Sequence, residues 1–281
     1  MKRNLLFFAF TLWSCFLLSS CAQPEHRYNI QELIHEIDAS LEKEEIDATI
    51  KLIDNTLYVY VPVEKLFVET DKTKSNFINF SVNYLNGAYK NKVFYYNFSI
   101  KKLPEKRKNT HNLSFDETTR KIAQKVQYAV TNKYMNSDTE IEFIVESYAD
   151  INQGYIFSYI TYHKDLEKYF CGALPYEEYS KRIVQDYIQS EILINNKNAV
   201  GLEFEGVTKE TFLSKQITQR INNYFSREIP PNTSIKDTIT NIIKHTLKYY
   251  QFNDYLLVQL EDLYKEKLDV FSKTEIEDFR L

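Results

Sequence analysis

Apolar residues recur three and four positions apart in the segment that starts at residue 29, which predicts an amphipathic helix over residues 29–45. The residues that share one face of this helix are Ile30, Leu33, Ile34, Ile37 and Leu41. Asn29 followed by Glu32 has the residue types and spacing of a capping box. The apolar face therefore predicts that the helix packs on a core.

Beyond this helix the apolar positions alternate with polar ones, which predicts strands. The four alternating segments cover residues 48–52, 57–61, 78–84 and 94–100. Asp54 and Asn55 predict a tight hairpin between the first two strands, and Asn86 and Gly87 predict a turn between the last two. We therefore expect one helix and four antiparallel strands in this part of the chain.

Residues 101–112 (KKLPEKRKNTHN) are charged and lack an apolar period, which predicts an exposed loop and the best candidate for a domain boundary. We accordingly divide the folded chain into residues 29–110 and 111–281. Basic side chains in this stretch could meet anionic lipid or a cell-wall polymer, but a solvated loop is the favoured interpretation. These side chains are Lys101, Lys102, Lys106, Arg107 and Lys108.

After the predicted boundary, helical and alternating segments succeed one another. Ser114 and Glu117 predict a second capping box, and the helix after them is expected to bury one apolar stripe. The residues of that stripe are Phe115, Ile122, Val126, Ala129 and Val130. Residues 141–145 predict a strand, residues 150–154 a turn, and residues 155–162 the returning strand.

The last hundred residues predict three more helices and further strands. Pro175 suits the first turn of a helix over residues 176–192, and residues 202–207 predict a short strand. A helix from Lys209 carries Leu213, Ile217, Ile221 and Tyr224 on one face. The final long helix from Ser234 carries Ile235, Ile239, Ile242, Ile243 and Leu247 inward, and residues 256–260 predict a strand paired with residues 267–271.

A helix followed by a strand pair recurs at residues 29–63, 114–162 and 234–271, although the side chains do not repeat. Because hairpins imply antiparallel pairing, we expect an α+β fold in which helices cover one face of a mainly antiparallel sheet.

Composition and charge narrow the possible functions. Apolar residues make up 43% of the chain, which is enough for a core. The 22 tyrosines and 19 phenylalanines have two explanations, an AT-rich genome and an aromatic ligand-binding surface, of which the first is favoured. The formal net charge of −4 weighs against a nucleic-acid partner, because such proteins usually carry a basic face.

The first residues of the chain follow the order of segments found in an export signal. Lys2 and Arg3 precede a mostly apolar run over residues 5–18, which is shorter than the roughly twenty residues of a membrane-spanning helix. The run ends in Leu18-Ser19-Ser20-Cys21, which resembles the lipobox of bacterial lipoproteins. The alternatives are an uncleaved N-terminal anchor and a cleaved leader without lipid.

The resemblance implies that residues 1–20 are a signal peptide, that cleavage occurs before Cys21, and that Cys21 carries the lipid, with a further acyl chain often added to its amino group. Residues 21–28 would then tether the folded part close to a membrane of the cell envelope. Ala22 after the cysteine slightly favours the outer membrane, if the organism has one. Loss of Lys2 and Arg3 would take the formal net charge from −4 to −6.

Candidate chemistry is sparse. The chain contains no nucleotide-binding, zinc-protease or serine-hydrolase motif, and it has five glycines. Of the three cysteines, Cys15 lies in the leader and Cys21 is the proposed lipid site, so Cys171 has no partner for a disulfide within the mature chain. His163 with Asp165 and Glu167 could bind a metal, but a solvated cap between a strand and a helix is the favoured interpretation.

Two further features have a functional and a structural interpretation. Glu140, Glu142 and Glu146 could be paired acids, although outward carboxylates on a strand are the commoner case. Cys171 could be a nucleophile, although packing as a small apolar residue is favoured.

We therefore expect a membrane-anchored envelope lipoprotein that binds or scaffolds an envelope protein or a cell-wall component, with no cofactor or metal. This expectation depends on the absence of catalytic motifs. The alternative is an envelope hydrolase that acts on cell-wall or lipid material through acids brought together from distant segments.

Overall fold

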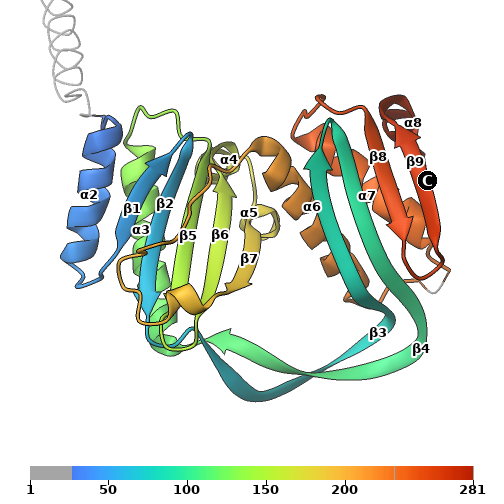
Figure 1. Cartoon of the computed structure of the whole chain (residues 1–281), viewed down its shortest axis with the longest axis horizontal. Coiled ribbons are helices and arrows are strands. Elements are labelled where there is room, and N and C mark those ends of the chain that lie inside the picture. Colours follow the sequence, from blue (N-terminus) through green and yellow to red (C-terminus); the bar gives the residue numbers. More distant parts are fainter. Residues whose placement is uncertain (1–26, 231, 281) are drawn as a thin grey trace, which may run out of the picture.

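Backbone pairing divides the chain between two sheets that lie on either side of helix α6 (Lys209–Phe225) (Figure 1). The computed structural model describes residues 27–230 and 232–280, and only the backbone of residues 70–79 and 104–113. The first sheet has the order β1-β2-β5-β6-β7, with β2 and β5 parallel and the other neighbours antiparallel. Its strands are β1 (Thr49–Ile53), β2 (Thr56–Val63), β5 (Phe143–Asp150), β6 (Tyr155–Tyr162) and β7 (Val184–Gln189).

The second sheet repeats this pairing with four strands in the order β3-β4-β8-β9. Its strands are β3 (Phe67–Lys90), β4 (Val93–Phe115), β8 (Leu257–Asp262) and β9 (Lys267–Ser272). Here β4 and β8 are parallel, and both outer pairs are antiparallel. The predicted α+β class with mainly antiparallel strands is confirmed, but the two parallel pairs are not anticipated by a pattern that only indicates hairpins.

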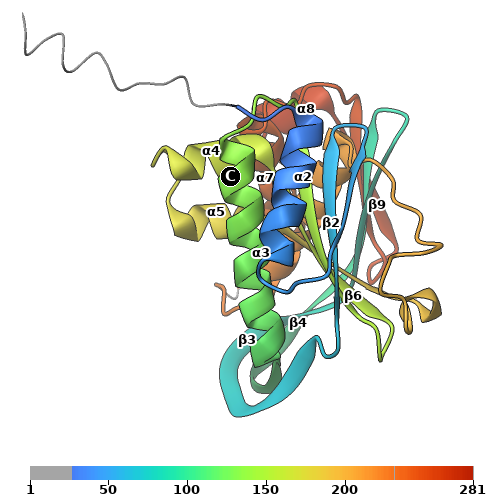
Figure 2. The ribbon, with the colours of Figure 1, turned by 90° about the vertical axis from the view of Figure 1, so that its left-hand side faces the viewer.

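The helices surround and separate the two sheets. They are α2 (Ile30–Glu42), α3 (Glu117–Met135), α4 (His163–Phe170), α5 (Tyr176–Arg182), the short 3-10 helix η1 (Glu191–Leu193), α6 (Lys209–Phe225), α7 (Ile235–Tyr249) and α8 (Lys273–Asp278). Figure 2 shows α2 and α3 side by side on one face of the first sheet, with α4 and α5 next to α3. Among the helices of residues 27–230 and 232–280, none combines the length and apolar character needed to cross a membrane.

Both faces of the first sheet are covered. Val59 on β2 and Ile144 on β5 pack with α2 and α3, whereas Phe143 and Val145 belong to the cluster formed by α6, α7 and the second sheet. The prediction that helices cover one face is therefore wrong for the first sheet. The reason is that α6 places Phe212 and its apolar neighbours on the opposite face.

Several local predictions are confirmed. Asn29 and Glu32 form both hydrogen bonds of the capping box at the start of α2. Asp54 adopts a positive φ of 51° in the turn between β1 and β2. The helix-and-hairpin unit recurs as α2-β1-β2, α3-β5-β6 and α7-β8-β9. In α7, the inward residues Ile239, Ile243 and Leu247 are buried.

The turn predicted at Asn86 and Gly87 is wrong, because β3 continues to Lys90. The chain reverses at Asn91 and Lys92, whose φ values are 52° and 62°. Gly87 has a different role. A Cβ atom there would lie 2.5 Å from Thr218 Oγ1 on α6 and 2.6 Å from the Tyr96 ring, so the glycine allows β3 to approach α6 closely.

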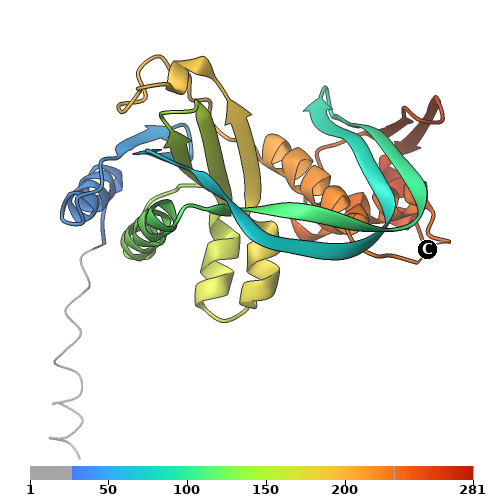
Figure 3. The same ribbon diagram turned by 90° about the horizontal axis from the view of Figure 1, so that it is seen from below.

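The loop predicted over residues 101–112 is also wrong, because these residues belong to β4 and pair with β3. Figure 3 shows this long ribbon running from the first sheet to the second. Backbone pairing with β3, interrupted by three register shifts, allows a polar stretch without an apolar face to remain a strand. The predicted division falls at residue 110. Each sheet combines a hairpin that begins before this residue in the chain with strands that come after it. The four strands predicted before residue 101 are two hairpins in separate sheets.

Two element boundaries and one predicted strand also differ from the predictions. The helix predicted over residues 176–192 ends at Arg182, and the chain continues as β7, which pairs with β6. Pairing with β6 satisfies the backbone of a segment rich in β-branched and aromatic residues. Residues 202–207 form no strand. The N-cap of α3 is Asp116, which accepts a hydrogen bond from the Thr118 amide, because β4 still includes Ser114.

Candidate functional site

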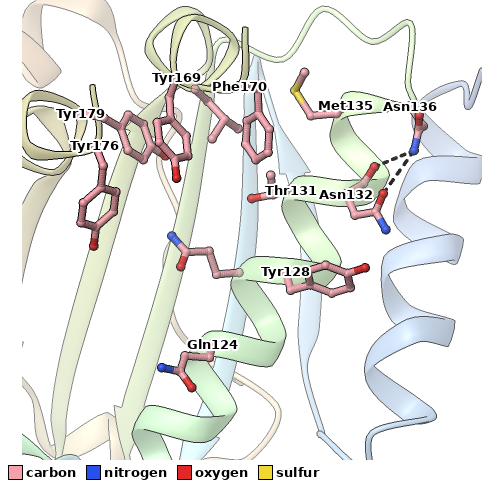
Figure 4. Close-up of a pocket in the computed structure, with 12 residues that line it drawn as sticks. Gln124, Tyr128, Thr131, Asn132, Met135, Asn136, Tyr169, Phe170, Tyr176 and Tyr179 are labelled. Atoms are coloured by element: carbon pink, nitrogen blue, oxygen red, sulfur yellow. Dashed lines mark hydrogen bonds between the residues drawn. The ribbon is translucent and has the colours of Figure 1, made fainter. Parts of the chain in front are cut away.

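Three helices enclose a surface groove of about 530 Å³, which we call the aromatic groove (Figure 4). Its lining residues are Gln124, Gln127, Tyr128, Thr131, Asn132, Met135 and Asn136, at or near α3, and Leu166, Tyr169, Phe170, Tyr176 and Tyr179 on α4 and α5. The volume falls within the range of about 300–1,000 Å³ that is usual for ligand sites.

One side of the aromatic groove is the solvent-facing surface of α3. The helix places Val126, Ala129 and Val130 against the sheet. Tyr128 lies off this stripe and is 72% exposed, and Met135 is 40% exposed. Exposed side chains of this size on the polar face of a helix do not pack in the protein core, so they are available to contact a partner.

The other side consists of four aromatic rings from α4 and α5, which Figure 4 shows gathered together. Tyr169 and Tyr179 are stacked, with ring centroids 4.7 Å apart and an interplanar angle of 6°. Tyr169 also meets Phe170 edge to face at 5.3 Å. Tyr176 lies at the outer end and is 66% exposed, whereas Tyr179 is 4% exposed. The buried ring therefore supports the exposed ones.

A buried polar network holds α4 and α5 in place. Asp165 on α4 is 2% exposed and accepts hydrogen bonds from Arg182 Nη1 at 3.1 Å and from the Tyr250 hydroxyl at 2.7 Å. Tyr249 also donates to Asp165, at 3.1 Å, and its ring lies 3.5 Å from the Arg182 guanidinium carbon. Arg182 in turn donates to Glu178 at 2.9 Å. Tyr249 is the last residue of α7 and Tyr250 is its C-cap, so the network ties the aromatic side of the groove to α7.

The aromatic groove has no charged lining residue. Its polar groups are the amides of Gln124, Gln127, Asn132 and Asn136 and the hydroxyls of Thr131 and the tyrosines. Asn136 Nδ2 donates to the Asn132 carbonyl oxygen at 3.0 Å and to Asn132 Oδ1 at 3.3 Å. The site can therefore hold an uncharged ligand by stacking and neutral hydrogen bonds.

A buried acid lies on the sheet side of α3. Glu146 on β5 is 8% exposed, and the Tyr148 hydroxyl donates to its Oε2 at 3.0 Å. Burial raises the pKa of Glu146 to about 7, and the hydrogen bond from Tyr148 opposes that shift. Glu146 is not among the residues that line the aromatic groove.

The three glutamates considered as outward or paired acids do not converge. Glu140 is exposed, Glu142 is half-buried and Glu146 is buried. The prediction of an outward Glu146 is wrong because β5 is the central strand of the first sheet and is buried along its whole length.

The cluster of His163, Asp165 and Glu167 is not a solvated cap. Asp165 points into the buried network, and His163 Nδ1 lies 3.1 Å from the Glu142 carbonyl oxygen. Within the part of the chain that the structure describes, no group of three or more His, Cys, Asp or Glu side chains is placed to hold a metal ion.

The two cysteines singled out by the sequence have different outcomes. Cys21 lies outside the described residues, so its lipid remains a prediction. Cys171 is exposed, and the prediction that it packs in the core is wrong. It comes directly after α4, in a turn where the chain faces solvent.

Sequence patterns miss the aromatic groove because its two sides are about forty residues apart in the chain. Tyr128 and Met135 could have been noticed, since they interrupt the polar face of a predicted helix. The periodicity of the sequence does not predict that Tyr169 and Tyr176 lie opposite these two residues, because their position depends on how α4 and α5 pack on α3.

Comparisons with protein families, with curated proteins and with solved structures find no match for this chain.

Proposed function

We propose that this chain is a lipid-anchored module of the bacterial cell envelope that binds another envelope component in the aromatic groove. The observation that carries the proposal is the exposure of Tyr128, Phe170 and Tyr176 around one concave, uncharged site. Clustered exposed aromatic residues on a folded protein are typical of a binding surface.

The position of the groove supports a role beside a membrane. The Tyr28 amide donates to the Asn136 carbonyl oxygen at 3.0 Å, and Arg27 pairs with Asp138 at 2.6 Å. Asn136 lines the aromatic groove, so the segment that leads back to Cys21 joins the fold at the rim of the site. A lipid on Cys21 would hold the groove within about 25 Å of the bilayer, the reach of seven extended residues.

Anchoring is tested by expressing the full chain in bacteria fed an alkyne fatty acid. Wild type should carry the label, and Cys21→Ser should lose it, because only a cysteine thiol at the lipobox accepts the diacylglyceryl group. Cys171→Ser is the matched control, since it removes the exposed cysteine. Equal labelling of wild type and Cys21→Ser would refute lipidation at Cys21.

Binding is tested by incubating the full chain, held in lipid nanodiscs, with isolated cell-wall sacculi and with beads that carry envelope proteins, and then sedimenting the mixture. Wild type should co-sediment with one of them, and Tyr128→Ala and Tyr176→Ala should each weaken binding about tenfold, a usual loss when a central aromatic contact is removed. Tyr264→Ala, which removes a ring that is 56% exposed in the turn between β8 and β9, is the control. Equal binding by all four proteins would refute a function in the groove.

A hydrolase is the second candidate, because the raised pKa of Glu146 suits a general acid. Against it, Glu146 lies outside the groove and its pKa is perturbed by burial and Tyr148, with no second carboxylate among the causes. Retaining and inverting glycosidases require two carboxyl groups across the reacting bond. Release of soluble fragments from sacculi by wild type and not by Glu146→Gln would favour the hydrolase.

A further inference from the structure

We infer that the aromatic groove holds an uncharged oligosaccharide segment of a cell-wall glycan. This inference rests on the proposed function and names the chemical class of the ligand. Three properties of the site support it: its lack of charge, the character of its hydrogen-bonding groups, and its exposed aromatic rings.

The first property is the absence of charge. None of the twelve side chains that line the aromatic groove is acidic or basic. A phosphate, a carboxylate or an ammonium group taken from water into this site would lose hydration without meeting a countercharge, which is costly. The part of the ligand that enters the groove is therefore neutral.

The second property is that the polar groups along α3 can both donate and accept. The side chains of Gln124, Gln127 and Thr131 have no hydrogen-bond partner among the described residues, so each remains available to a ligand. Sugar hydroxyls also donate and accept, so each can pair with such a group. An acyl chain would leave these amides unpaired, and a proline-rich segment offers them only carbonyl acceptors.

The third property is a set of aromatic rings held in fixed positions. The stack of Tyr169 on Tyr179 is secured by burial of Tyr179, and the Asp165 network fixes the helices that carry both rings. The C–H face of a sugar is apolar and can lie against an exposed ring, as Tyr176 offers. Preorganised rings reduce the ordering cost of binding, which suits a ligand with many hydroxyls to desolvate.

The experiment uses the full chain in lipid nanodiscs and three probes, each titrated by calorimetry. The probes are the β-1,4-linked hexamer of N-acetylglucosamine, the β-1,4-linked hexamer of glucose, and a decaproline peptide. At least one hexamer should bind wild type, and Tyr176→Ala and Gln127→Ala should each weaken it about tenfold. Tyr176→Phe should keep most of the affinity, because it preserves the ring, and Tyr264→Ala should keep all of it.

Two results would overturn the inference and leave the proposed function intact. Decaproline could bind in a Tyr176-dependent manner while neither hexamer does, which would assign the groove to peptides. Alternatively, capture by sacculi or by the envelope-protein beads could depend on Tyr176 while no hexamer binds or competes, which would exclude an uncharged glycan. Failure of the proposed function itself is distinguished by envelope capture that does not change in Tyr128→Ala and Tyr176→Ala.

Discussion

The two sheets share one pairing pattern in different surroundings. In each, the second strand of one hairpin pairs in parallel with the first strand of another, β2 with β5 and β4 with β8. The central strand β5 is buried along its whole length, whereas β8 alternates between buried and half-buried residues. The same connectivity therefore supports a sheet covered on both faces and a sheet whose interior face alone is tightly packed.

The two patterns also differ in the elements that come after their last strand. After β6 the chain forms α4, α5 and β7, and the two helices supply four aromatic rings to the groove. After β9 it forms only α8, in which Ile276 is the buried residue. The repeated units are therefore a scaffold, and the aromatic side of the candidate site belongs to α4 and α5, which have no counterpart after β9 among the described residues.

The largest expected effect comes from a substitution that removes the buried network beneath α4 and α5. Arg182→Ala leaves Asp165 as a buried carboxylate without its cationic partner, so the free energy of unfolding should fall by about 3–5 kcal/mol. The measurement is urea denaturation of the full chain, followed by circular dichroism. Lys121→Ala removes the exposed pair with Glu117 in the same unit and should change stability little. A loss no larger than that of the control would show that the network does not hold α4 and α5.

The next effect concerns the sheet that is covered on both faces. The pKa of Glu146 is about 7 in the folded chain, against 4.5 as the ordinary value. Between these two pKa values the unfolded state loses its proton first, so stability falls as pH rises from about 4.5 to about 7. Glu146→Gln removes this loss. The free energy of unfolding of the variant minus that of wild type should therefore be about 3 kcal/mol larger at about pH 8 than at about pH 4.

The measurement is the free energy of unfolding as a function of pH for wild type and Glu146→Gln. Glu140→Gln makes the same chemical change at an exposed position just before β5 and is the matched control. A difference between Glu146→Gln and wild type that does not vary with pH would show that the buried carboxyl does not titrate across this range.

The burial of each element decides how far the sequence could predict it. Where one face of an element meets solvent, as in α2, α7 and β8, the apolar period identifies the element and its inward residues. Where both faces are buried, as in β5, the alternation of apolar and polar residues does not show whether a carboxylate such as Glu146 is buried or faces solvent. The parallel pairs, the long β3-β4 ribbon and the aromatic groove depend on contacts between distant segments, which local patterns do not encode.

A smaller effect tests the second sheet. Gly87→Ala places a Cβ atom 2.6 Å from the buried Tyr96 ring on β4 and 2.5 Å from Thr218 Oγ1 on α6, so these side chains or the elements that carry them must shift. We expect a loss of about 1–3 kcal/mol in the free energy of unfolding, as for other overpacked sites. Asn86→Ala changes the exposed neighbour on the same strand and is the control. Equal losses from both variants would show that the close approach of β3 to α6 does not limit the side chain at position 87.

The smallest expected effect tests whether Tyr176 belongs to the groove surface or to the core beneath it. Tyr176 is 66% exposed and touches its neighbours only at the edge of the ring cluster, so Tyr176→Ala should change the free energy of unfolding by no more than about 0.5 kcal/mol. Tyr179→Ala removes a buried ring from the same helix and should cost clearly more, because it leaves a cavity beneath Tyr169. Thermal and urea unfolding of both variants measures the contrast. If Tyr176→Ala were as destabilising as Tyr179→Ala, Tyr176 would be part of the core, and lost binding in that variant could then result from lost structure. A stable Tyr176→Ala chain that no longer binds would instead assign the ring to the ligand.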